Sequence, residues 1–259
     1  MLINDMEIKP VAFFHSSLTS KFGIPRQSGL ANELQGQIVF EPEYQREEAV
    51  RGLEQFDYLW LIWEFSANPQ TINLKSQTSA RACSLSPSEA TERNLKSQTS
   101  NLKLTVRPPR LGGNERVGVF ASRSPFRPNR LGLSCVYINK VEMTRDKGPV
   151  IHVKGADLMD GTPIYDIKPY VTYADSHADA RSGFVDEKEW HPLQVVMTDE
   201  CQRCFSAEEL AGLCQVLAQD PRPRYHDDEE RVYGMPFGGF DVRFRVKDRV
   251  LTVVKVVRL

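Results

Sequence analysis

The chain has 259 residues, 41% of them apolar, and its 33 lysines and arginines nearly balance 34 acidic residues. This composition is typical of a globular protein with one large or two modest domains. It excludes nucleic-acid binding through bulk charge, so such a partner would need a local basic patch. No apolar run approaches the roughly 18 residues that cross a bilayer, the N-terminus lacks the features of a secretory signal, and an odd number of cysteines fits a reducing compartment. We therefore expect a cytoplasmic protein with no membrane partner.

Short strand-like runs separated by glycine and proline dominate the first two thirds of the chain. One helix interrupts them, expected over residues 46–56, with Ala49, Val50 and Leu53 on one face. The spacing favours a barrel or sandwich over alternating βαβ units. The expected strands are Val11–Phe14, Gln37–Phe40, Tyr58–Phe65, Arg116–Phe120, Leu133–Val141 and Pro149–Val153.

The last third of the chain follows a different pattern, beyond a polar, turn-rich linker over residues 174–187. Ser206 and Glu209 have the spacing of a capping box and predict the start of a helix. Two alternating runs, 240–246 and 250–257, then predict a β-hairpin. The pattern indicates two domains, a β-rich one over 8–173 and a small α+β one over 190–259.

One segment of the first domain is repetitive: NLKSQTS occurs at 73–79 and again at 94–100. Two copies of so short a unit cannot form a solenoid. The residues between them are polar and show no sustained apolar period, so residues 71–104 are expected to form a disordered insert.

The densest chemical signal is the segment 107–132, which holds six arginines and one acid. Guanidinium groups on a loop suit phosphate and carboxylate recognition because their planar fork bonds bidentately. The alternative is a solvated loop with scattered ion pairs.

Other patterns are weaker when they are read alone. Pro25-Arg26-Gln27 reads as a loop with a single arginine, and the Asp157–Tyr170 stretch reads as an ordinary hairpin turn around Asp160-Gly161. Cys201 and Cys204 have zinc-like spacing but no second pair, so we expect no metal. Neither GxGxxG nor a P-loop is present.

Taken together, five segments resemble the TrmO/TsaA family of tRNA N6-adenine methyltransferases, in the same order along the chain. They are KFGIPRQSGL (21–30), RGLEQFDYLWLIWEF (51–65), TVRPPRLGGNERVGVFASRSPFRPNRLGLS (105–134), DLMDGTPIYDIKPY (157–170) and LAQDPRPRY (217–225). The resemblance implies a mainly β protein, with an N-terminal single-sheet β-barrel that binds S-adenosylmethionine without a Rossmann fold and a small α+β C-terminal domain. It also implies a homodimer.

The resemblance further implies which residues meet the methyl donor. The corresponding positions are Pro25, Arg26, Gln27, Ser66, Ala67, Arg123, Leu131, Met159, Asp160, Gly161 and Thr162. The chain departs from the family pattern at three places: Ser66-Ala67 replaces the frequent His-Gln, RPNR replaces RPNP at Arg130, and His15-Ser16-Ser17 replaces RSP.

The reaction that the resemblance implies is methylation of N6 of threonylcarbamoyladenosine beside the anticodon of a tRNA. Asp160 is the candidate general base, although it can instead orient the donor or the turn. The tRNA would be held by Arg107, Arg110, Arg127 and Arg130. Two alternatives stay open at this point: a catalytically impaired S-adenosylmethionine- or RNA-binding regulatory module of the same fold, and a small-molecule methyltransferase.

Overall fold

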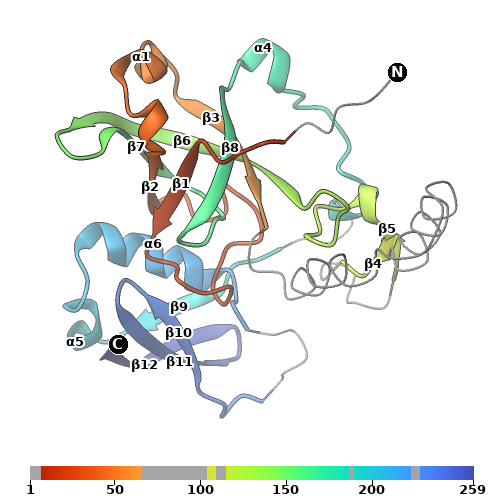
Figure 1. Cartoon of the computed structure of the whole chain (residues 1–259). Coiled ribbons are helices and arrows are strands. Elements are labelled where there is room, and N and C mark those ends of the chain that lie inside the picture. Colours follow the sequence, from red (N-terminus) through yellow and green to blue (C-terminus); the bar gives the residue numbers. More distant parts are fainter. Residues whose placement is uncertain (1–6, 66–103, 109–114, 187–189, 223–227) are drawn as a thin grey trace, which may run out of the picture. The chain divides into compact units, whose positions relative to one another are not determined.

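The computed structural model of the protein describes residues 7–65, 104–108, 115–186, 190–222 and 228–259 (Figure 1). The chain forms two compact units: one joins Met1–Glu64 with Leu133–Leu259, and the other is Phe65–Gly132. The expected disordered insert, 71–104, lies outside the described residues except for Leu104. Across the described ranges, no helix is long and apolar enough to span a membrane.

A closed barrel of six antiparallel strands dominates the first unit, and its order is β1-β2-β7-β6-β3-β8. Inward and outward side chains alternate along each strand, so that β3 buries Leu59, Leu61 and Trp63 inside the barrel. The prediction of a mainly β fold built on a barrel is thereby confirmed. The strands are β1 (Ala12–Ser16), β2 (Gln35–Phe40), β3 (Tyr58–Glu64), β6 (Leu131–Thr144), β7 (Gly148–Lys154) and β8 (Thr162–Pro169).

The prediction of one continuous helix over residues 46–56 is wrong. A single turn, α1 (Glu47–Val50), is followed by Gly52 in the left-handed conformation with φ 87°, and then by the 3-10 helix η2 (Leu53–Gln55). Gly52 adopts this conformation without steric cost and breaks the helical path. Another 3-10 helix, η1 (Pro42–Tyr44), precedes α1.

The strand expected over Arg116–Phe120 is also much shorter than predicted. In the second unit, β5 (Val117–Gly118) pairs with β4 (Thr105–Val106), and the chain then turns into the 3-10 helix η5 (Val119–Ala121). This unit is inserted in the chain between β3 and β6, which are neighbours in the barrel.

The interpretation of the Asp157–Tyr170 stretch as a hairpin turn is wrong. β7 and β8 stand three places apart in a ring of six strands, so they lie on opposite sides of the barrel. Residues 155–161, which we name the crossing segment, therefore pass across one end of the barrel and bury Ala156 and Leu158 against its core. The rest of the stretch is β8, which the sequence did not predict as a strand.

The C-terminal part of the first unit is a four-stranded sheet, ordered β10-β11-β12-β9, with helix α6 packed on it (Figure 1). The predicted capping box is present at Ser206 and Glu209, and the predicted hairpin is β11–β12, which turns through Asp248 and Arg249 at φ 47° and 63°. Short helices α4 (Thr172–Asp175) and η6 (Gly183–Val185) occupy the expected linker. The remaining elements are β9 (Gln194–Met197), α5 (Asp199–Gln202), α6 (Ala207–Ala218), β10 (Tyr233–Phe237), β11 (Phe240–Lys247) and β12 (Val250–Arg258).

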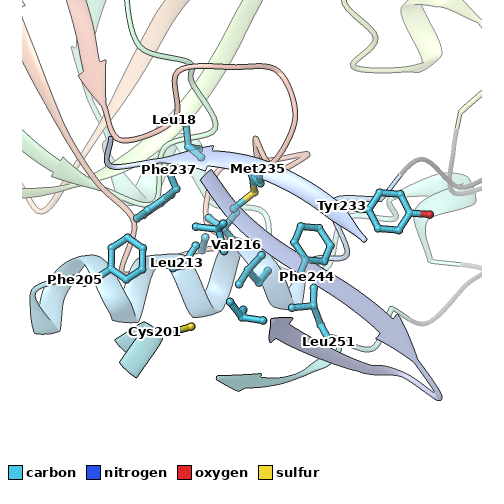
Figure 2. Close-up of a cluster of buried hydrophobic side chains, with 14 of the residues drawn as sticks. Leu18, Cys201, Phe205, Leu213, Val216, Tyr233, Met235, Phe237, Phe244 and Leu251 are labelled. Carbon is cyan, nitrogen blue, oxygen red and sulfur yellow. The ribbon is translucent and has the colours of Figure 1, made fainter. Parts of the chain in front are cut away.

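The hydrophobic core of this C-terminal part includes residues from the loop that follows β1. Leu18, Ala31 and Leu34 of this 17–34 loop belong to the same buried cluster as α6 and the sheet. Figure 2 shows Leu18 beside the sheet residues of this cluster. Helix α6 holds the loop closely because Gly212 lacks a side chain, and a Cβ there would lie 3.1 Å from the Leu34 Cα. The loop is therefore fixed from the C-terminal side.

Candidate functional site

The loops expected to bind the donor leave the barrel at one end. Ser16 at the end of β1 pairs with Gly36, near the start of β2, while Lys154 at the end of β7 pairs with Gln35. Thr162 at the start of β8 pairs with Phe14. Since the 17–34 loop and the crossing segment begin and end at these positions, the topology places both of them at the same end of the barrel.

Backbone hydrogen bonds join the two loops directly. The Gly29 N–H donates to the Gly155 carbonyl at 2.9 Å, and the Gly155 N–H donates to the Leu34 carbonyl at 2.9 Å. Gly29 follows the predicted donor-binding residues Pro25, Arg26 and Gln27 by only two to four positions. The structure thus brings the Pro25–Gln27 loop onto the segment that carries the other predicted donor residues.

Arg26 also faces the C-terminal part of the chain. Its guanidinium carbon lies 5.4 Å from the centre of the Trp190 ring, within range of a cation–π interaction. This contact restricts the arginine side chain and adds Trp190, which the sequence did not single out, to the surroundings of the site.

Met159 to Thr162 form a tight turn at the end of the crossing segment. The Thr162 N–H and its Oγ1 both donate to the Met159 carbonyl, at 3.2 and 2.7 Å. Gly161 has φ 74° and no described atom within 4 Å of the place where a Cβ would stand. The turn therefore presents open backbone on which a ligand can rest.

Asp160 fastens this turn to β1. Its Oδ1 accepts from the Ser16 N–H at 3.1 Å and lies 3.2 Å from His15 Nδ1, while the Asp160 N–H donates to the Leu18 carbonyl at 2.8 Å. These contacts favour a role in orienting the turn, which is one of the two roles expected from the sequence. That Asp160 is the general base stays a prediction.

A buried chain of polar side chains leads from the barrel interior to the crossing segment. Trp63 Nε1 donates to Ser134 Oγ at 2.9 Å, and Ser134 Oγ donates to Asp157 Oδ1 at 2.5 Å. Ser134 is fully buried and Trp63 is 6% exposed, whereas Asp157 is half-buried. The sequence offered no signal for Ser134 or Trp63, and Asp157 appeared only as the first residue of the 157–170 stretch.

The arginine-rich segment belongs to the second unit, and its arginines differ in their contacts. Arg127 donates to the Ser122 carbonyl at 2.7 Å and lies 6.0 Å from the centre of the Phe120 ring, so it helps to hold the segment's own shape. Arg130 has φ 50°, and its carbonyl accepts from the Phe65 N–H at 3.0 Å.

The remaining predicted site residues are divided between described and undescribed parts of the chain. Arg107 and Arg123 are exposed, and Leu131 is the first residue of β6. Arg110, Ser66 and Ala67 lie outside the described residues.

Two of the described cysteines, Cys135 and Cys214, are poorly suited to act as nucleophiles. Burial raises the pKa of the Cys135 thiol, and the Asp175 charge raises it further; burial likewise raises the pKa of Cys214. Cys201 is buried in the C-terminal core while Cys204 is exposed. In the described part of the chain, no group of three or more His, Cys, Asp or Glu side chains could hold a metal.

Comparison with known proteins gives consistent matches over nearly the whole chain. The profile of the tRNA-methyltransferase O N-terminal domain matches residues 13–86 and 89–176, and that of the TrmO C-terminal domain matches residues 191–259. A tRNA (adenine(37)-N6)-methyltransferase of Escherichia coli K12 is 34% identical over 95% of each chain. A protein of the same name from Eikenella corrodens is 46% identical over 55% of this chain and 80% of its own length.

A solved structure gives the same result. The crystal structure of TrmO from Pseudomonas aeruginosa superposes with a TM-score of 0.70 at 29% identity, covering 99% of both chains. The five motifs, the barrel and its C-terminal sheet, and these matches all agree, and the chain belongs to the tRNA-methyltransferase O family.

Proposed function

We propose that this protein is an S-adenosylmethionine-dependent tRNA (adenine(37)-N6)-methyltransferase, which methylates N6 of threonylcarbamoyladenosine beside the anticodon. The observation that carries the proposal is the match to the Escherichia coli enzyme over 95% of both chains, together with both domains of the family. Residues 8–173 would bind the donor and residues 190–259 would hold the 17–34 loop in place. The reaction would take place in the cytoplasm.

The charges at the barrel end suit such a donor. S-adenosylmethionine carries a carboxylate, an ammonium group and the sulfonium that supplies the methyl group. Arg26 can pair with the carboxylate, and the acidic side chain of Asp160 complements the cationic groups. Gly161 leaves space in which a ligand can approach the Met159–Thr162 turn, whose Asp160 and Thr162 N–H groups are already donated to the Leu18 and Met159 carbonyls. These features support donor binding by Pro25, Arg26 and Gln27 together with this turn; Ser66, Ala67, Arg123 and Leu131 complete the proposed set.

Methyl transfer to nitrogen requires the reacting atoms to be held in line and close together, and much of the barrier can be removed by such positioning. Here the 17–34 loop and the crossing segment are tied to each other and to β1 by backbone hydrogen bonds. A site built on such fixed backbone holds its ligands without reorganisation of the loops.

The experiment that tests the proposed function is nucleoside analysis by mass spectrometry. Transfer RNA from cells that lack the protein should contain threonylcarbamoyladenosine without the N6-methyl group, and purified protein with S-adenosylmethionine should add one methyl group to that nucleoside alone. Identical nucleosides in cells with and without the protein, and no transfer in vitro, would instead favour a regulatory module that has lost catalysis.

We propose that Arg107, Arg110, Arg127 and Arg130 bind tRNA phosphates. Arg107 is the best one to test because it is exposed, whereas Arg127 donates to the Ser122 carbonyl and so also holds the shape of its own segment. Arg107→Ala should weaken tRNA binding and lower the salt dependence, log Kd against log salt, by about 1 per lost phosphate contact. Arg145→Ala is the matched control, since Arg145 is exposed in the β6–β7 turn at the opposite end of the barrel. Equal slopes for both variants would contradict a phosphate contact at Arg107.

We further propose that the protein is a homodimer. An apolar strip on the outside of the adjacent strands β3 and β6 supports this: Tyr58, Leu133 and Tyr137 are 44%, 55% and 40% exposed. The Tyr58 and Tyr137 rings pack edge to face, 5.4 Å apart. Light scattering should give twice the mass of one chain, and a monomeric mass would contradict the proposal.

A further inference from the structure

We propose that Asp157, held by the buried Trp63–Ser134 pair, is the catalytic carboxylate that accepts the proton from the methylated nitrogen. This inference rests on the proposed function and assigns a step within it. It starts from Ser134, whose side chain is fully buried inside the barrel on an inward-facing position of β6. Its inward neighbours on the strand, Val136 and Ile138, are apolar, and a valine at 134 would avoid burying a hydroxyl.

The chemistry of the side chains decides which of Trp63, Ser134 and Asp157 donates and which accepts in this series of hydrogen bonds. An indole N–H can only donate, so Trp63 Nε1 uses an acceptor lone pair of Ser134 Oγ, and the serine proton is directed to Asp157. Asp157 Oδ1 is thus an acceptor, at 2.5 Å.

The position of Asp157 fits this role. It lies in the crossing segment, two residues after Gly155, which is bonded to the 17–34 loop, and two residues before Met159, where the proposed donor turn begins. It is half-buried, so its charge is less screened than that of a surface acid. Asp160, in contrast, uses Oδ1 to fasten the turn to β1, with a side chain 40% exposed.

In the proposed reaction, transfer of the methyl group is coupled to transfer of the N–H proton. The nitrogen lone pair forms the new N–C bond while the S–C bond breaks, and its electron pair stays on sulfur, giving a neutral thioether. The N–H proton passes to Asp157 as its bonding electrons return to nitrogen. The threonylcarbamoyl group makes this nitrogen part of a urea, whose delocalised lone pair is a weak nucleophile, so removal of the proton assists the attack. Ser134 and Trp63 are positioning residues in this scheme.

The test compares isosteric variants in one assay. Asp157→Asn keeps an oxygen that accepts from Ser134 but removes the base, and should lower kcat by about 10²–10⁴-fold. Its KM for tRNA, its donor affinity by calorimetry and its melting temperature should stay near those of the wild type. Asp146→Asn, at an exposed aspartate in the β6–β7 turn at the opposite end of the barrel, is the matched control and should retain the wild-type kcat. Loss of kcat in Asp160→Asn with full activity in Asp157→Asn would overturn the proposal.

Chemical rescue distinguishes a catalytic role of Asp157 from a purely structural one, because an added carboxylate can replace a missing base but not a missing structural contact. Asp157→Ala should regain activity on addition of formate, a small carboxylate that can enter the vacated space, whereas Ser134→Ala should lose part of kcat and show no rescue. Full activity of Asp157→Asn beside an active wild type would refute this inference alone. A wild type that binds the donor but methylates no tRNA would refute the proposed function and this inference with it.

Discussion

A tRNA that carries threonylcarbamoyladenosine should be methylated about 10 to 100 times faster than the same tRNA without the modification. The threonine part brings a carboxylate, which a guanidinium group can hold with charge-assisted hydrogen bonds worth about 1.5–3 kcal/mol. The carbamoyl group also makes the attached N–H more acidic than that of a plain adenine amine, so that a carboxylate can remove its proton. The exposed arginines Arg107 and Arg123 are the candidate partners for the threonine carboxylate.

The measurement is a single-turnover methylation assay on two preparations of one tRNA, with and without the modification. Arg123→Ala should reduce the difference between them if this residue holds the carboxylate, and Arg145→Ala should leave it unchanged. Equal rates on both tRNAs would eliminate the carboxylate contact and the acidified nitrogen together, and would leave generic tRNA methylation as the activity.

Replacing Leu18 by alanine should destabilise the protein by about 2–5 kcal/mol and lower its affinity for S-adenosylmethionine about tenfold, or by about 1.4 kcal/mol. The stability loss follows from complete burial of Leu18 in the C-terminal cluster (Figure 2). The affinity loss follows because the truncated side chain no longer anchors the backbone at position 18, whose carbonyl accepts the Asp160 N–H at 2.8 Å. One residue therefore ties the C-terminal core to the proposed donor turn.

Leu251→Ala is the matched control for this effect. Leu251 is fully buried in the same cluster, on β12, and makes no backbone contact with the donor turn. It should cost a similar free energy of unfolding, measured by urea denaturation, while calorimetry on the folded protein should give the wild-type donor affinity. Equal donor affinity in the two variants would show that the C-terminal core does not position the turn.

Regular patterns allowed much of the fold to be predicted from the sequence. Alternating residues gave β3 and the β11–β12 hairpin, and Ser206 with Glu209 gave the start of α6. The predictions failed where a single residue or a distant contact decides the structure. Gly52 breaks an otherwise helical pattern by its left-handed conformation, and the 157–170 stretch resembles a hairpin because local spacing does not say which strands pair.

The sequence likewise does not show which distant residues meet at the candidate site. The resemblance supplied Pro25, Arg26, Gln27 and the Met159–Thr162 turn, and the structure joins these two segments through Gly29 and Gly155. The chain from Trp63 through Ser134 to Asp157 joins residues 71 and 23 positions apart. No local sequence motif singles out any of these three residues. The pairing of distant strands in the closed barrel brings them together.

The placement of the second unit between β3 and β6 has a consequence for how this family can diversify. These two strands are neighbours in the closed barrel, so the chain departs and returns at points about 5 Å apart, the usual spacing of paired strands. Material can be gained, lost or exchanged there as in a long surface loop, at little entropic cost and without any shift in barrel register. The doubled NLKSQTS heptapeptide falls within this interval. A chimaera that receives the 65–132 segment of a relative should therefore keep the barrel while acquiring the arginine pattern, and with it the tRNA preference, of its source.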